Sequence, residues 1–86
     1  MKLYIIILDE VYNDQVLQHK PIVRLSKEEA RKELNELYTA GCCAYTDWVT
    51  EKSDDSFSLY SDGEWSESHF DAEIHEVEVE GIEEVI

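Results

Sequence analysis

The sequence predicts an α+β fold in which an antiparallel sheet of about four strands carries one helix on one face. The expected order of elements is β-β-α-β-β. Three observations predict it: a capped helical stretch from Ser26 to Gly41, apolar strand-like stretches before it, and alternating stretches after it. The 86 residues are enough for one small α+β domain, with residues 1–86 sharing a single modest core.

The helix is the clearest element of the sequence. Ser26 is followed three residues later by Glu29, which is the pattern of a capping box at a helix start. Ala30 and Leu34 then recur at helical spacing and begin an apolar stripe. Gly41 stands where a glycine in the left-handed conformation commonly ends a helix. We therefore expect this helix to cover one face of the sheet.

The stretch before the helix predicts a hairpin. Residues 3–8 are apolar at every position, which is typical of a central strand covered on both faces, or on one face with a dimer contact on the other. Asn13 and Asp14 supply turn chemistry, and residues 22–25 form a second strand-like run. Pro21 has no amide hydrogen for a ladder, so it is expected at the start of that strand or at an edge.

The stretch after the helix is less regular. Residues 42–53 show no clean period and fit either a further helical turn or a strand leading into Glu51. Phe57 and Leu59 alternate with polar neighbours, as in a half-buried strand. Asp62 and Gly63 are typical of a tight hairpin turn, with a return strand beginning at residues 64–66.

The last strand contains a shift of phase. Its apolar residues stand at even positions up to Ile74 and at odd positions from Val77 onward. A β-bulge at His75 or Glu76 would bring both sets to the face under the helix, and we predict one there. The alternative is that the valines turn toward a second surface. Residues 81–86 suggest no assignment.

Charge is the strongest constraint on function. The chain has 21 acidic and 7 basic residues, a formal net charge of −14, and no Lys or Arg lies beyond residue 52. Nucleic acids and anionic membranes would be repelled, so neither is an expected partner. The charge instead leaves three alternatives: a basic protein partner, a cation, or a role in solubility alone.

Cysteine usage and apolar runs bear on location. Cys42 and Cys43 are adjacent and have no third cysteine to pair with, which excludes a disulfide framework and suits a reducing compartment. The apolar run of residues 3–8 is too short for a signal peptide or a membrane span. We therefore expect a cytoplasmic protein.

The sequence contains no convincing metal or catalytic motif. Cys42, Cys43, His69 and His75 are candidate zinc ligands but lack the usual spacings. The acidic turns lack the calcium-loop pattern, and the three glycines stand apart from one another. No histidine stands in a context that suggests an activated nucleophile. We expect no metal, no cofactor and no enzymatic activity.

The acidic C-terminal half carries the functional hypothesis. Alternation along a strand places Glu76, Glu78 and Glu80 in one row. We predict that such carboxylates dock on a basic protein partner, in the manner of a nucleic-acid mimic or an inhibitor of phage or mobile-element type. The predicted partner-binding residues are Glu64, Glu67, Asp71, Glu73, Glu76, Glu78 and Glu80.

Two other interpretations remain open. The acids can form a solvated face that discourages edge-to-edge aggregation. The chain can instead serve as a sheet-edge adaptor or as a homodimer that pairs through a sheet edge. The hairpin–helix–hairpin pattern, with residues 25–30 opening the helix, resembles small proteins of bacterial and phage genomes but no particular family.

Overall fold

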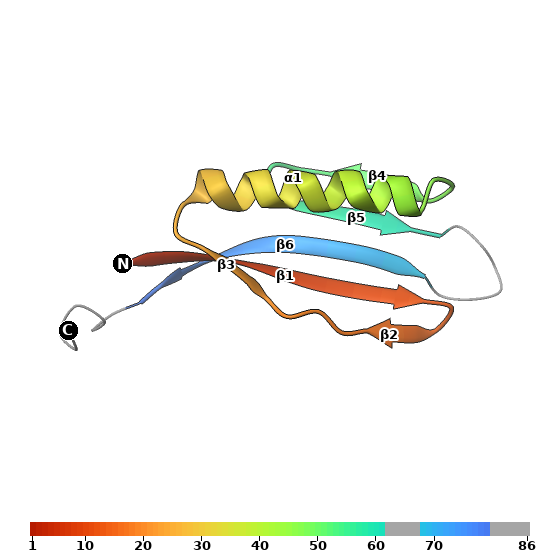
Figure 1. The fold of residues 1–86 in the computed structure, drawn as a ribbon, viewed down its shortest axis with the longest axis horizontal. Coiled ribbons are helices and arrows are strands. Elements are labelled where there is room, and N and C mark those ends of the chain that lie inside the picture. The colour runs from red at the N-terminus through yellow and green to blue at the C-terminus, as the bar shows by residue number, and fades with distance from the viewer. Residues whose placement is uncertain (62–67, 80–86) are drawn as a thin grey trace.

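The computed structural model describes residues 1–61 and 68–79. Its elements are β1 (Lys2–Tyr12), β2 (Gln15–Leu17), β3 (Ile22–Arg24), α1 (Lys27–Ala44), β4 (Val49–Lys52), β5 (Ser56–Tyr60) and β6 (His69–Glu78). One helix packs against an antiparallel sheet (Figure 1), which confirms the predicted α+β class. The described residues form six strands rather than about four.

The sheet is built around the long pair β1 and β6. Its order is β2-β1-β6-β5-β4. β3 pairs with the same edge of β1 as β2 does, but nearer the start of β1. β2 and β4 are the strands beyond the predicted four, and both are short. β2 arises because Asn13 and Asp14 adopt positive φ angles of 51° and 64°, which folds the chain tightly back onto β1. Both alternatives for residues 42–53 hold in part, because α1 continues to Ala44 and β4 occupies Val49–Lys52.

The predicted β-bulge is wrong. β1 and β6 pair without interruption from Lys2 opposite Glu78 to Val11 opposite His69. The alternation therefore continues, and Val77 lies on the face opposite Ile74. Val77 is 38% exposed there. The alternative of a second apolar surface is the correct one.

The helix begins as predicted and ends later. Ser26 is the N-cap, and its Oγ accepts a hydrogen bond from the Glu29 amide at 3.1 Å. The predicted end at Gly41 is wrong, because the helix continues to Ala44 and is capped by Tyr45. Gly41 is buried against the sheet instead, where a Cβ would lie 2.6 Å from Leu59 Cδ1. Its role is to allow a close approach between helix and sheet.

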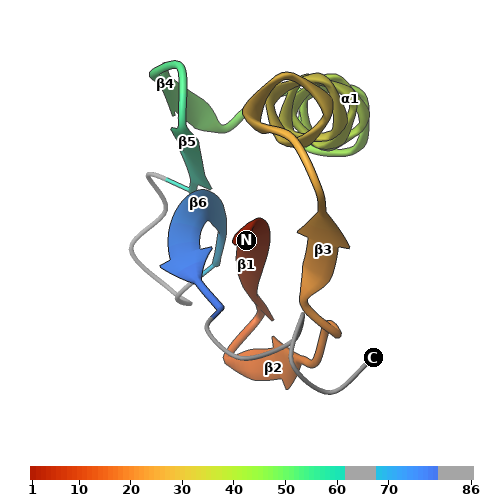
Figure 2. The same cartoon turned by 90° about the vertical axis from the view of Figure 1, so that its left-hand side faces the viewer.

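The core lies between α1 and one face of the sheet. Ile6, Leu34 and Leu59 are fully buried, one each from β1, α1 and β5. Phe57 and Phe70 pack edge to face beside them, with ring centroids 5.3 Å apart. In the end-on view of Figure 2 the helix lies on one side of the sheet, where it packs against β1, β3, β5 and β6. The opposite face of the sheet is the open face.

Candidate functional site

The open face is defined by strand alternation. Because successive side chains point to opposite faces, the core positions of β1, β5 and β6 fix which residues point away from the helix. At the centre of the sheet these are Ile7 and Asp9 on β1 and His69, Asp71, Glu73 and His75 on β6. Ser56 and Ser58 on β5 and Glu51 on β4 continue the same face.

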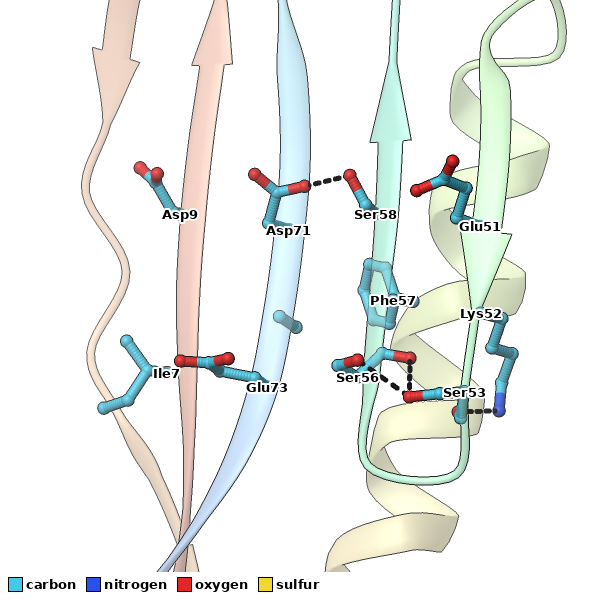
Figure 3. A pocket seen from close by; sticks show the side chains of 11 residues that line it. Ile7, Asp9, Glu51, Lys52, Ser53, Ser56, Phe57, Ser58, Asp71 and Glu73 are labelled. Carbon is cyan, nitrogen blue, oxygen red and sulfur yellow. Dashed lines mark hydrogen bonds between the residues drawn. The ribbon is translucent and has the colours of Figure 1, made fainter.

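Four carboxylates gather on this face. Asp9 lies directly opposite Asp71, Asp71 opposite Ser58, and Ser58 opposite Glu51, so these side chains form one row across four strands (Figure 3). Glu73 is the next residue of β6 on this face after Asp71, and it lies opposite Ile7. The row borders a groove of about 670 Å³ with Ile7 and Ala72 among its lining residues.

Basic residues are distributed differently from these carboxylates. Lys2, Arg24 and Lys52 occupy strand positions on the face that carries the helix. Lys27, Arg31 and Lys32 are in α1 itself. None of the strand positions on the open face of residues 1–61 and 68–79 is Lys or Arg. In the described residues the open face therefore carries acids without Lys or Arg at its strand positions, whereas the helix side carries both signs, and Lys52 reaches the edge of the groove.

Histidines lie beside two of these carboxylates. His69 Nδ1 lies 3.0 Å from Asp71 Oδ2, and His75 Nε2 lies 2.6 Å from Glu73 Oε1. Ser58 Oγ donates a hydrogen bond to Asp71 Oδ1 at 2.5 Å. In the described residues no Lys or Arg forms an ion pair with any of the four carboxylates.

One end of the open face is apolar. Ile7, Val23 and Val77 are 41%, 46% and 38% exposed, and they come from three strands that meet around β1. An exposed apolar patch beside charged residues is typical of a surface that contacts another macromolecule. The open face thus offers an acidic centre and an apolar end side by side.

The predicted partner-binding residues separate into three groups. Asp71 and Glu73 lie on the open face. Glu76 and Glu78 lie on the other face, where Glu76 is 3.9 Å from Lys2 Nζ and Glu78 is 3.1 Å from the N-terminal amine. Glu64, Glu67 and Glu80 fall outside the described residues, as do the predicted turn at Asp62 and Gly63, the predicted start of a return strand at residues 64–66, and the tail 81–86.

Sequence reasoning missed two members of the acidic row. Asp9 and Glu51 lie far from the C-terminal half in sequence and join it only through strand pairing. A signal was nevertheless present, because His, Asp, Glu and His alternate at positions 69, 71, 73 and 75 between the apolar positions of the same strand. That alternation predicts a polar, titratable face opposite the core.

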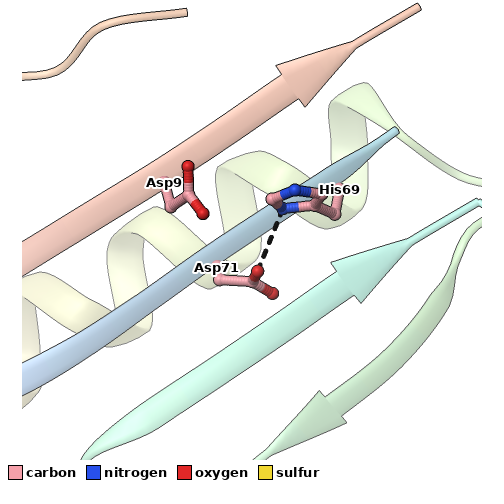
Figure 4. Close-up of side chains that lie close together, drawn as sticks. All are labelled: Asp9, His69 and Asp71. Atoms are coloured by element: carbon pink, nitrogen blue, oxygen red, sulfur yellow. Dashed lines mark ion pairs between the residues drawn. The ribbon is translucent and has the colours of Figure 1, made fainter. Parts of the chain in front are cut away.

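Three side chains of the open face lie close enough together to bind a single metal ion. One ligand atom from each of Asp9, His69 and Asp71 lies within 4.8 Å of the other two (Figure 4). The candidate zinc ligands named from sequence do not converge in this way. Cys42 packs against the core under the helix, whereas His69 and His75 belong to the open face.

A second polar cluster lies on the helix side. Glu10 is 8% exposed; its carboxylate accepts a hydrogen bond from the Tyr45 hydroxyl at 2.5 Å and lies 2.6 Å from His19 Nε2. The hydrogen bond to Glu10, together with burial, raises the pKa of Tyr45 to about 12. Tyr45 also stacks on Trp48, with ring centroids 3.8 Å apart. Because these contacts fasten the end of α1 to β1, we assign this cluster a structural role.

Comparison with protein-family models, curated proteins and solved structures finds no match to this chain. Within residues 1–61 and 68–79, no helix combines the length and apolar character that crossing a membrane requires. The open face is therefore the feature of the chain from which its function is inferred.

Proposed function

We propose that the protein is a non-enzymatic binding module that docks on a basic protein partner through its open face. The observation that carries the proposal is that the open-face strand positions of the described residues hold several carboxylates and no Lys or Arg. Asp9, Glu51, Asp71 and Glu73 share the open face, while the basic strand positions and the basic residues of α1 belong to the other side.

Electrostatic complementarity supports a basic partner. Four clustered carboxylates in a chain of net charge −14 attract cationic surfaces and repel phosphate-rich ones. The exposed apolar side chains of Ile7, Val23 and Val77 add surface whose burial stabilises a complex. The acidic centre steers and orients the partner, and the apolar end contributes affinity.

The same charge argues against pairing of two open faces. A symmetric dimer through this face would bring the two acidic rows together, and such like-charge contacts are unfavourable. A partner of opposite charge removes that repulsion. An acidic face that occupies a phosphate-binding groove of a nucleic-acid enzyme is one form that such docking takes.

The test compares two variants with equal charge changes. Glu51→Gln with Glu73→Gln neutralises two carboxylates of the open face. Glu28→Gln with Glu36→Gln neutralises two exposed carboxylates on the helix and serves as the matched control. Both variants and the unmodified chain are immobilised, exposed to lysate of the native host, and washed with increasing salt.

We expect the unmodified chain and the helix variant to retain the same basic protein, and the open-face variant to release it at lower salt. Equal retention by both variants would contradict docking through the open face. Retention that does not depend on salt would contradict an electrostatic role.

A sheet-edge adaptor is the second candidate. β4 is the last strand of the sheet, pairs only with β5 in the described residues, and has all four residues exposed. Such an edge can accept a strand from another chain through main-chain hydrogen bonds. Binding of this kind would persist in high salt and in the Glu51→Gln and Glu73→Gln variant.

A further inference from the structure

We infer that Asp9, His69 and Asp71 form a binding site for a divalent first-row transition-metal ion on the open face. The inference concerns the isolated chain and does not depend on the proposed docking function. The three residues supply two carboxylates and one imidazole from the adjacent strands β1 and β6.

The spacing of the ligand atoms fits one ion. Two atoms that bind the same ion at about 2.1 Å and at right angles lie about 3.0 Å apart. His69 Nδ1 and Asp71 Oδ2 are already at 3.0 Å. Asp9 lies directly opposite Asp71 in the register, and its ligand atom is within 4.8 Å of both. The Asp9 ligand atom therefore has to approach the other two by at most 1.8 Å, from 4.8 Å to 3.0 Å, to complete a three-ligand set.

The strands hold two of the ligands in place. His69 and Asp71 are two positions apart on β6 and point to the same face. His69 Nδ1 is shielded from solvent and is directed between the carboxylates (Figure 4). Ser58 Oγ donates to Asp71 Oδ1, which leaves Oδ2 directed toward His69. Hydrogen bonds of this kind orient metal ligands in proteins.

Charge and ligand type define the class of ion. A divalent cation would neutralise the facing Asp9 and Asp71 carboxylates, which have no Lys or Arg ion partner among the described residues. Carboxylate oxygens suit Mn²⁺, imidazole nitrogen suits Zn²⁺ and Fe²⁺, and a mixed set accepts ions of this series. Mn²⁺ is the better probe because thiolates prefer softer ions, so Cys42 and Cys43 do not compete.

Paramagnetic broadening locates the ion. Substoichiometric Mn²⁺ is added to the ¹⁵N-labelled chain in the presence of excess Mg²⁺, which suppresses diffuse association with the acidic surface. We expect the amide signals of residues 9, 69 and 71 to broaden first and EDTA to restore them. Uniform broadening over all acidic segments would overturn the inference.

Affinity measurements identify the ligands. We expect His69→Ala and Asp9→Asn each to weaken Mn²⁺ binding by about tenfold or more, since even outer-shell contacts contribute tenfold to a hundredfold. His75→Ala is the matched control, because His75 contacts Glu73 on the same face outside the three-ligand set. The spectrum of each variant reports whether it is folded. If His69→Ala does not fold, Asp9→Asn still tests the site, because Asp9 occupies an exposed strand position.

An equal loss of Mn²⁺ affinity in His75→Ala would contradict the assigned site. Unchanged Mn²⁺ affinity in a folded His69→Ala or Asp9→Asn chain would contradict it too. The site and the docking function can also fail separately. Glu51→Gln with Glu73→Gln leaves all three ligands in place, so it is expected to bind Mn²⁺ normally even where partner capture is weakened.

Discussion

Gly41 provides the sharpest test of how the helix meets the sheet. A Cβ at this position would lie 2.6 Å from Leu59 Cδ1 and 3.1 Å from Phe70 Cδ2. Leu59 is fully buried within the packed core, so a shift of its methyl group would disturb the side chains around it. Overpacking of this kind costs about 1–3 kcal/mol, whereas replacing Gly by Ala within a helix gains about 1 kcal/mol.

The two effects can be separated with a double-mutant cycle. Leu59→Val removes the δ-methyl groups and costs little by itself, about 0.5–1.5 kcal/mol for a lost methylene. In that background Gly41→Ala keeps its helix-forming gain and loses much of the clash. We therefore expect the effect of Gly41→Ala on the free energy of unfolding to be about 1–3 kcal/mol more favourable beside Val than beside Leu.

Urea unfolding followed by circular dichroism measures all four chains of the cycle. Ala40→Gly is the control, because Ala40 is the exposed neighbour of Gly41 in the same helix. It should cost about 1 kcal/mol with either residue at position 59. Additive effects of Gly41→Ala and Leu59→Val, within about 0.5 kcal/mol, would refute the close contact.

Three further predictions concern the helix start and two titrating groups. Ser26→Ala should lower the free energy of unfolding by about 1 kcal/mol in urea melts, because the Glu29 amide loses its acceptor. Tyr45 has a pKa of about 12 in the folded chain against an ordinary value of 10, so the native state binds more protons between these values. Stability should therefore fall as pH rises from 10 to 12, and Tyr45→Phe should remove that part of the pH dependence. The hydrogen bond from Arg31 lowers the pKa of Asp55 in the folded chain. The ion pair of Arg31 with Asp55 therefore stabilises the fold at pH values above the ordinary carboxyl pKa, and this stabilisation is lost as pH falls through the lowered pKa of Asp55. In an NMR titration, Arg31→Met should raise the pKa of Asp55.

Local signals predicted the fold class well. The Ser26 cap, the inward positions of Ala30 and Leu34 and the strand start after Pro21 follow from short-range chemistry, and the structure confirms them. Gly41 was misinterpreted because a glycine near a helix end has two explanations, a left-handed cap or a close approach. Only the position of Leu59, distant in sequence, distinguishes them.

The open face was predicted in part. Asp71 and Glu73 were among the predicted acids, and their alternation with Phe70 and Ala72 shows that they point away from the core. Their neighbours depend on the register between β1 and β6, which brings Asp9 opposite Asp71. A single sequence contains no direct record of such pairing, so neither the acidic row nor the three-ligand cluster could be assembled from it.

The proposed function depends on one claim: the open-face carboxylates attract a basic partner. The most direct measurement is the association rate constant of the captured partner as ionic strength is varied. We expect a steep fall with salt for the unmodified chain and for Glu28→Gln with Glu36→Gln, and a slower, less salt-dependent association for Glu51→Gln with Glu73→Gln. Identical rate constants and salt dependence for the two variants would contradict the claim.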